Sequence, residues 1–163
     1  MIDYYGYSRE KNVRIKRLDK VKADLRFLKK EEDLAKKIKE EIKNLRSDII
    51  DIKSGISDTD PVQGGGSTQE DKYCDAIDKV MELERLLKMI DLDTRALKQI
   101  LSTIDNEDYS LINKLWIEGT MSLRKLGPEV NMSKDTVRRK SDKVLLYIFE
   151  ELYIKTPKDV YPN

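Results

Sequence analysis

The feature that most restricts the fold is a long run, from Ser8 to Ser54, that contains neither glycine nor proline. Glycine and proline are the strongest local interrupters of a helix, and the run is rich in Lys, Glu, Leu and Ile. Its apolar residues recur at steps of three and four, as they do on one face of a helix. We therefore expect one long helix, or two in line, with this face: Leu18, Val21, Leu25, Leu28, Ala35, Ile38, Ile42, Leu45, Ile49, Ile52 and Ile56.

The apolar spacing slips between Leu28 and Ala35, where three acidic residues follow one another. A bend or a change of packing partner is expected at this point. The charge balance changes here too: Ser8 to Lys30 holds ten cations and three anions, whereas Glu31 to Ser54 holds six cations and seven anions. The basic half either touches a DNA backbone or is a solvated face that carries salt-bridge pairs.

A connector, Gly55 to Gly66, separates this helix from a second one. Ser67 and Glu70 have the spacing of a capping box, which predicts a helix start near Thr68. Two long amphipathic helices joined by a loop fold back most simply as an antiparallel hairpin, so residues 1–104 are expected to be a helical hairpin that also associates with a second chain as a homodimer. The inner face of the second helix is Tyr73, Ile77, Val80, Leu83, Leu87, Ile90, Thr94, Leu97, Leu101 and Ile104.

Residues 105–155 are expected to form a separate helical domain, followed by an irregular tail at 156–163. Asp105 or Asn106 is a suitable helix cap, and Asp108 to Glu118 reads as a short helix that ends at Gly119. Trp116 in this helix is interpreted as a core residue rather than a base-stacking one. The fold class predicted for the whole chain is therefore all-α.

The stretch from Thr120 to Arg139 has the spacing of a helix-turn-helix, with apolar residues that pack the two helices together: Leu123, Leu126, Val130, Met132 and Val137. Asn131 lies where the turn requires a left-handed backbone, which Asn tolerates better than most residues. Ser133 is a natural N-cap for a helix that begins at Lys134. Gly127 allows the two helices to approach closely, and Pro128 predicts that the first helix is short or kinked.

The second helix of such a unit places its exposed N-terminal residues in the DNA major groove. Arg138 or Arg139 could pair with guanine, Lys134 with guanine or phosphate, Thr136 with a thymine methyl or phosphate, and Asp135 with a cytosine amino group. The alternative is an ordinary helical hairpin with a solvated charged face. The complete expected DNA-binding set is Ser133, Lys134, Asp135, Thr136, Arg138, Arg139, Lys140, Ser122 and Arg124.

The composition argues against other classes of function. The chain has no histidine and one cysteine, Cys74, so the usual general base of hydrolases and a zinc finger are both missing. No apolar run approaches the length of a membrane span, and the N-terminus lacks the apolar core of a signal peptide. We expect a cytoplasmic protein that is not an enzyme and uses no cofactor or metal. Because the net charge is only +1, any nucleic-acid affinity must come from local patches.

The order of parts, with the C-terminal module LINKLWIEGTMSLRKLGPEVNMSKDTVRRKSDKVLLYIFEEL, resembles phage late-gene transcriptional activators of the RinA and ArpU type. The C-terminal ends of such proteins look like region 4 of bacterial sigma factors. The resemblance is best over Asp91 to Leu152. It implies promoter recognition by Ser133 to Lys140, activation of packaging and structural genes in the bacterial host cytoplasm, and contact with host RNA polymerase.

Two other functions remain open from the sequence. A packaging adaptor such as a small terminase subunit also combines a helix-turn-helix with an oligomerising coiled coil. A purely helical scaffold with no nucleic-acid role would show the same helix pattern. The leading hypothesis is a dimeric, sequence-specific regulator that binds double-stranded DNA.

Overall fold

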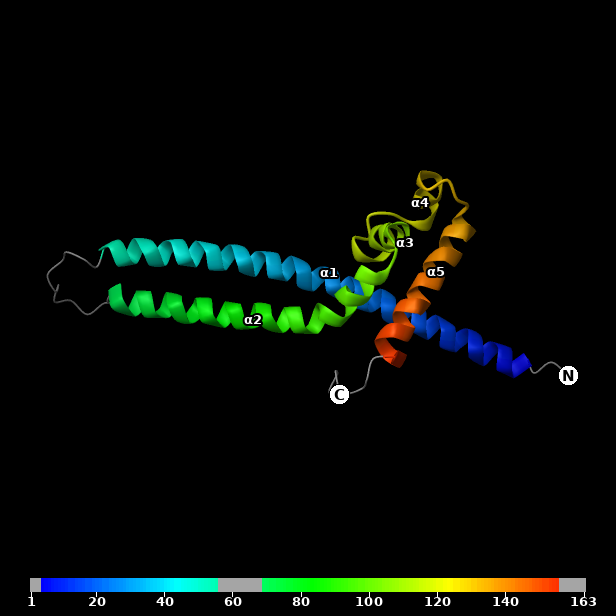
Figure 1. The fold of residues 1–163 in the computed structure, drawn as a ribbon, viewed down its shortest axis with the longest axis horizontal. Coiled ribbons are helices and arrows are strands. Elements are labelled where there is room, and N and C mark those ends of the chain that lie inside the picture. Colours follow the sequence, from blue (N-terminus) through cyan, green and yellow to red (C-terminus); the bar gives the residue numbers. More distant parts are fainter. Residues whose placement is uncertain (1–3, 56–68, 156–163) are drawn as a thin grey trace. The chain divides into compact units, whose positions relative to one another are not determined.

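The computed structural model describes residues 4–55 and 69–155, with side chains for residues 10–52 and 70–155. All regular structure in these residues is helical (Figure 1), which confirms the all-α prediction. The expected connector beyond Gly55, the Ser67 cap and the tail at 156–163 lie outside the described residues. The elements in order are α1 (Tyr4–Gly55), α2 (Gln69–Thr103), α3 (Asn106–Ile112), η1 (Asn113–Ile117), α4 (Leu123–Glu129), α5 (Lys134–Glu150) and η2 (Glu151–Lys155).

The first helix, α1, is a single uninterrupted helix of 52 residues rather than two in line. The second long helix, α2, has 35 residues. Both follow from sequences that lack helix breakers and repeat their apolar residues at helical spacing. Within the described residues, no helix combines the length and the apolar character that crossing a membrane requires.

The chain divides into two compact units, and the division differs from the expected boundary at residue 104. One unit, here called the hairpin unit, is residues 31–93, and the other, the C-terminal unit, is residues 1–30 together with 94–163. The reason is the slip in the apolar face of α1. Leu18, Val21, Leu25 and Leu28 pack in one core, whereas Ala35 and Ile38 pack in another. A change of packing partner, one of the two expected alternatives, is confirmed.

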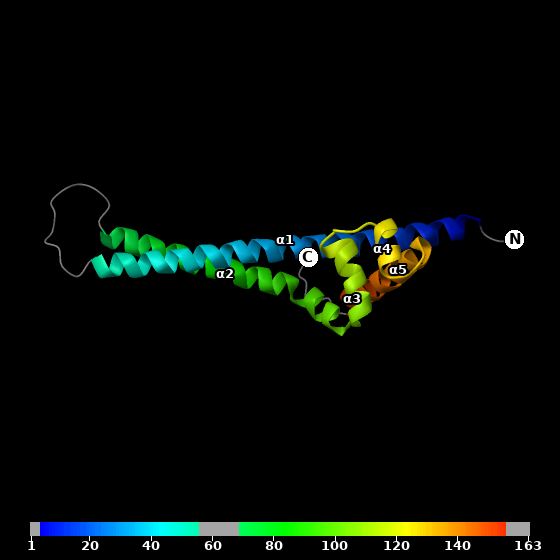
Figure 2. The same cartoon turned by 90° about the horizontal axis from the view of Figure 1, so that it is seen from above.

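In the hairpin unit, the second half of α1 and the first part of α2 lie side by side and run in opposite directions (Figures 1 and 2). Two cross-helix ion pairs flank the apolar contact: Arg46 Nη2 lies 2.5 Å from Glu84 Oε1, and Lys79 Nζ lies 2.8 Å from Glu41 Oε1. The apolar contact consists of buried Ile38, Ile42, Val80 and Ile90, with Ala35, Leu45, Ile49, Leu83 and Leu87 partly buried against them.

The C-terminal unit has the larger core. The N-terminal part of α1 and the end of α2 contribute to it, and α3, α4 and α5 supply the rest. Its buried apolar side chains are Leu18, Val21, Leu25, Leu28, Leu97, Leu101, Leu111, Ile112, Leu115, Ile117, Leu126, Val137, Val144, Leu145, Ile148 and Leu152. Thr94, which fills a slot in the apolar repeat of α2, is also buried, as the spacing predicts. The N-terminal part of α1 is therefore part of the domain that carries the helix-turn-helix.

Two helices of the C-terminal unit end in wider, π-helical turns. The predicted helix Asp108 to Glu118 begins earlier, at Asn106, and continues from Ile112 into η1. Asp105 is its N-cap: the carboxylate oxygen Oδ1 accepts a hydrogen bond from the Asp108 backbone N–H at 2.9 Å. Gly119 follows η1 with a φ of 63°, which confirms the expected left-handed stop. The second helix of the motif, α5, continues past Glu150 into η2.

Candidate nucleic-acid interface

The turn between α4 and α5 is built by a close backbone approach at Gly127. The Met132 N–H donates to the Gly127 carbonyl oxygen at 2.9 Å. A β-carbon at residue 127 would lie 2.8 Å from the Met132 carbonyl oxygen, closer than such atoms approach one another. The prediction that only a very small residue fits here is confirmed. The helix α4 has seven residues and contains Pro128, so it is short, as expected.

Asn131 and Ser133 set the direction in which α5 leaves the turn. Asn131 has a φ of 53°, the left-handed conformation that the spacing predicts. The Ser133 side chain accepts a hydrogen bond from the Thr136 backbone N–H at 3.1 Å, and its hydroxyl lies 2.8 Å from the Thr136 hydroxyl. The helix accordingly begins at Lys134. This N-cap satisfies one of the backbone donors that a helix start leaves unpaired.

The motif is anchored beneath the turn by apolar packing. Leu126 of α4 and Val137 of α5 are fully buried, and Leu123, Val130 and Met132 pack against the same core. An ion pair between Lys114 of η1 and Glu129 at the end of α4 ties the first helix of the motif to the preceding helix. The start of α5 is therefore held by elements on both sides of the turn.

The first two turns of α5 present most of the predicted reading residues to solvent. Ser133, Lys134, Asp135, Thr136, Arg138 and Arg139 are all exposed. Val137, which lies among them in the sequence, is fully buried, so the helix has one packed side and one open side in this region. Ser122 and Arg124, at the start of α4, are also exposed, and Ser122 is the N-cap residue of that helix.

Lys140 departs from the expected set because its ammonium group binds inside the domain. Its Nζ lies 3.2 Å from Glu107 Oε2 and 3.2 Å from Asp108 Oδ1, both on α3. Hydrogen bonds that Lys140 donates to the carboxylates of Asp108, first, and Glu107 raise its pKa above the ordinary value. The Asp108 Oδ1 atom is itself buried, so the Lys140 charge compensates it. Spacing alone placed Lys140 on the reading face, because it could not show that two carboxylates of α3 lie beside it.

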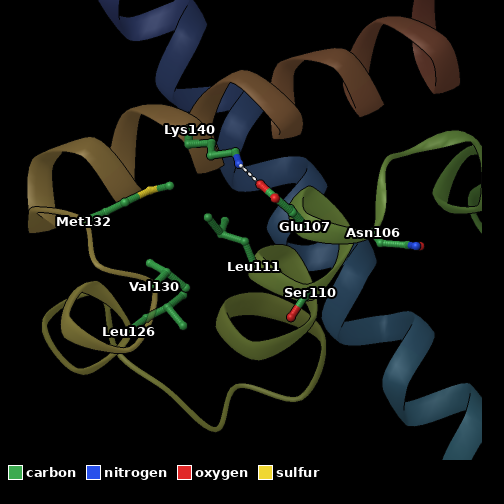
Figure 3. Close-up of a pocket in the computed structure, with 8 residues that line it drawn as sticks. All are labelled: Asn106, Glu107, Ser110, Leu111, Leu126, Val130, Met132 and Lys140. Carbon is green, nitrogen blue, oxygen red and sulfur yellow. Dashed lines mark hydrogen bonds and ion pairs between the residues drawn. The ribbon is translucent and has the colours of Figure 1, made fainter.

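A hollow of about 480 Å³ lies between α3 and the turn of the motif (Figure 3). The Lys140 to Glu107 ion pair closes one side of it, and Leu111, Leu126 and Val130 form its apolar part. None of the exposed residues from Lys134 to Arg139 lines it. The hollow and the exposed side of α5 from Lys134 to Arg139 are therefore different surfaces of the same motif.

Trp116 contacts other helices of the domain, as expected for a core residue rather than a base-stacking one. Its Nε1–H donates to the buried Ser141 hydroxyl of α5 at 2.9 Å. On α1, the ammonium group of Lys22 lies 4.8 Å from the centre of the indole ring, and the guanidinium of Arg26 lies 5.9 Å from it. Cations this close to a ring face are attracted to it. The indole thus links α1 to α5.

Comparisons with protein-family models, with curated proteins and with solved structures give no match to this chain. The functional argument therefore depends on the geometry of the motif and on the charges it displays.

Proposed function

We propose that this protein is a sequence-specific, double-stranded-DNA-binding transcription regulator that reads DNA with the first two turns of α5. The observation that carries the proposal is the combination of a well-formed helix-turn-helix with an exposed, cation-rich start of its second helix. Gly127, Asn131 and Ser133 have the geometry that the turn requires. In proteins with such a unit, the second helix enters the major groove with its N-terminal residues against the base edges.

The charges on α5 support DNA as the ligand. Lys134, Arg138, Arg139 and Lys143 are exposed, and none of them forms an ion pair with another described residue. A free guanidinium can bind guanine through two hydrogen bonds, and a free ammonium can bind a phosphate. Cations held in internal ion pairs, such as Lys140, would have to break those pairs first. The cations on the first turns of α5 can therefore bind a nucleic acid without first breaking an ion pair inside the protein.

The resemblance to phage late-gene activators supports a more specific role. In this proposal the protein activates a promoter of packaging and structural genes and contacts host RNA polymerase. Neither step requires chemistry from the chain itself, which fits a composition without histidine.

A homodimer is proposed for the assembly, through α2 of the hairpin unit. Within this unit, buried apolar side chains are few, whereas Met81, Met89 and Leu92 are 47%, 59% and 54% exposed. Their spacing places them along one side of α2. Covering them with the same surface of a second copy would remove exposed apolar area from water.

The test of the proposed function is selection of duplexes from a random-sequence pool by the full-length chain. The proposal predicts that a common sequence is enriched and that the chain prefers this sequence to a scrambled duplex of equal composition. Recovery of a random pool after several rounds would remove the proposal. The mass of the protein in solution separates the regulator from a packaging adaptor, because the adaptor would form a ring of many subunits and the regulator a dimer.

A further inference from the structure

The N-terminal part of α1 carries a cationic surface that the helix-turn-helix does not account for. Five residues on one side of this part face the rest of the C-terminal unit: Arg17 lies at the crossing with α5, and Leu18, Val21, Leu25 and Leu28 are buried. Continued towards the N-terminus at the same steps of four and three, the buried stripe reaches Arg14 and Lys11. Both of these residues are exposed. The face that is apolar where the core covers it therefore becomes cationic where the helix extends past the core.

The crossing of α1 and α5 is fixed by contacts near the end of α5. The Arg17 guanidinium lies 5.3 Å from the centre of the Phe149 ring, and the Lys20 ammonium lies 4.9 Å from the centre of the Tyr153 ring. The Tyr153 hydroxyl donates to Asp24 Oδ2 at 2.5 Å. From this crossing, the N-terminal end of α1 and the Lys134 end of α5 both extend to the right in Figures 1 and 2, with α5 rising and α1 descending in Figure 1.

The side of α5 that meets α1 is also the side that carries Arg138. Phe149 and Tyr153 contact α1, and Arg138 precedes them by eleven and fifteen residues, which is close to a whole number of helical turns. Arg138 and the pair Lys11 and Arg14 therefore face the same space. Acidic side chains on these surfaces are few: Glu10 on α1, and Asp135 and Asp142 on α5.

The distances of the cationic residues from the crossing of α1 and α5 suit a DNA duplex. At the helical rise of about 1.5 Å per residue, Arg138 lies about 16 Å along α5 from the crossing, and Lys11 lies about 9 Å along α1 from it. A major groove is about 12 Å wide and bordered by two phosphate backbones. A duplex that received the start of α5 in its major groove would present one of its phosphate backbones to the N-terminal part of α1. Neither Lys11 nor Arg14 is ion-paired with another described residue, so each is available to a phosphate.

We propose that residues 10–17 of α1 are a second DNA contact, in which Lys11 and Arg14 bind phosphates of the duplex whose groove receives α5. This inference rests on the proposed DNA-binding function. The contact adds affinity and fixes the orientation of the duplex but reads no base, because phosphates carry no direct sequence information. Of the two interpretations that the sequence leaves open for the basic half of α1, it favours contact with a DNA backbone over a solvated face.

The experiment measures the salt dependence of duplex binding by the full chain with Lys11→Ala and Arg14→Ala combined. Each lost phosphate contact lowers the slope of log affinity against log salt by about 0.9, so the double variant should lose about two units of slope. Its affinity for the selected and the scrambled duplex should fall by the same factor. Both residues are exposed, so the far-ultraviolet circular dichroism and melting temperature should match the wild type.

The matched control is Lys16→Ala combined with Lys30→Ala. These lysines are also exposed, lie on the opposite side of the same helix from the buried stripe, and form no ion pair with a described residue. The control removes the same charge but should change the slope by less than half as much. Equal slopes for the two double variants would overturn the inference, since the effect would then be general charge loss.

Ethylation of individual phosphates gives an independent readout. The inference predicts phosphate positions at which ethylation weakens wild-type binding but has no effect on the Lys11→Ala, Arg14→Ala variant. Absence of any such position would also overturn it. If the protein prefers a selected sequence but the Lys11→Ala, Arg14→Ala variant has the same salt slope as the control, only the second contact is disproved. If the protein prefers no sequence, the proposed function itself is disproved, whatever the salt slope.

Discussion

Gly127 and Met132 are in direct backbone contact across the turn, and no room remains between them for a methyl group. The first prediction concerns Gly127→Ala. Helix propensity alone would favour Ala over Gly by about 1 kcal/mol. The new β-carbon, however, would lie 2.8 Å from the Met132 carbonyl oxygen, and forcing the two backbones apart costs about 1–3 kcal/mol. The variant should therefore lower the free energy of unfolding, measured by denaturant titration of the fluorescence of the single tryptophan.

The control for this variant is Lys125→Ala, an exposed substitution in the same short helix. Its effect should stay within about 0.5 kcal/mol. If Gly127→Ala were as stable as Lys125→Ala, the turn would be looser than the structure indicates.

The second prediction concerns Lys140, which sequence spacing assigned to DNA and the structure places against α3. Lys140→Met keeps the length of the side chain but leaves the buried Asp108 Oδ1 without its compensating charge. The free energy of unfolding should fall by about 1–2 kcal/mol. Below the melting transition, the salt slope of DNA binding should match that of the wild type.

Lys143→Met serves as the comparison, because Lys143 is exposed on the same helix. It should leave the stability unchanged. A reduced salt slope for folded Lys140→Met, with no loss of stability, would instead return Lys140 to the DNA-binding set.

The third prediction concerns acid stability and the cap of α3. The hydrogen bond from the Asp108 backbone N–H lowers the pKa of Asp105 below its ordinary value of 3.8, and weaker contributions come from the Glu107 backbone and the Lys140 charge. Because the folded state prefers the ionised carboxylate, this contribution is present above the unfolded pKa and is lost as the pH falls through the folded one.

Asp105→Asn tests this directly, because asparagine caps helices well without titrating. Between about pH 5 and about pH 2, the free energy of unfolding should fall less in the variant than in the wild type. Parallel pH profiles would show that the Asp105 carboxylate has no part in acid sensitivity.

The fourth prediction concerns assembly through α2. Met89→Glu combined with Leu92→Glu places charges in the exposed apolar strip of the hairpin unit. If this strip is the dimer contact, the double variant should be monomeric at concentrations where the wild type is dimeric, as measured by sedimentation or light scattering. Lys72→Glu, at an exposed position on the opposite side of α2, makes the same kind of charge change and should leave the dimer intact. A monomeric wild type would contradict the proposed assembly.

Local patterns in the sequence were sufficient to predict the helices and the geometry of the turn. Asn131, Ser133 and Gly127 each satisfy a requirement that depends on a few neighbouring residues, and all three have the predicted conformation or contact. The slip between Leu28 and Ala35 indicated a bend or a change of packing partner, and the structure has the change of partner.

Contacts between segments far apart in the sequence could not be predicted in this way. The charge of Lys140 gives no indication that Glu107 and Asp108 lie beside it, and Trp116 gives none that its partners are Lys22, Arg26 and Ser141. The division of the chain was missed for a related reason. The apolar stripe shows where α1 packs, but not that Leu18 to Leu28 complete the core of the C-terminal unit.

The most direct measurement of the central claim is the binding of Arg138→Ala and Arg139→Ala to a set of duplexes in which each base pair of the selected sequence is changed in turn. The account predicts that at least one of the variants loses about 1–3 kcal/mol of discrimination at one base pair and keeps the preferences of the wild type elsewhere. If both variants instead lose affinity equally for every duplex, the start of α5 binds only the backbone, and the claim that it reads sequence is contradicted.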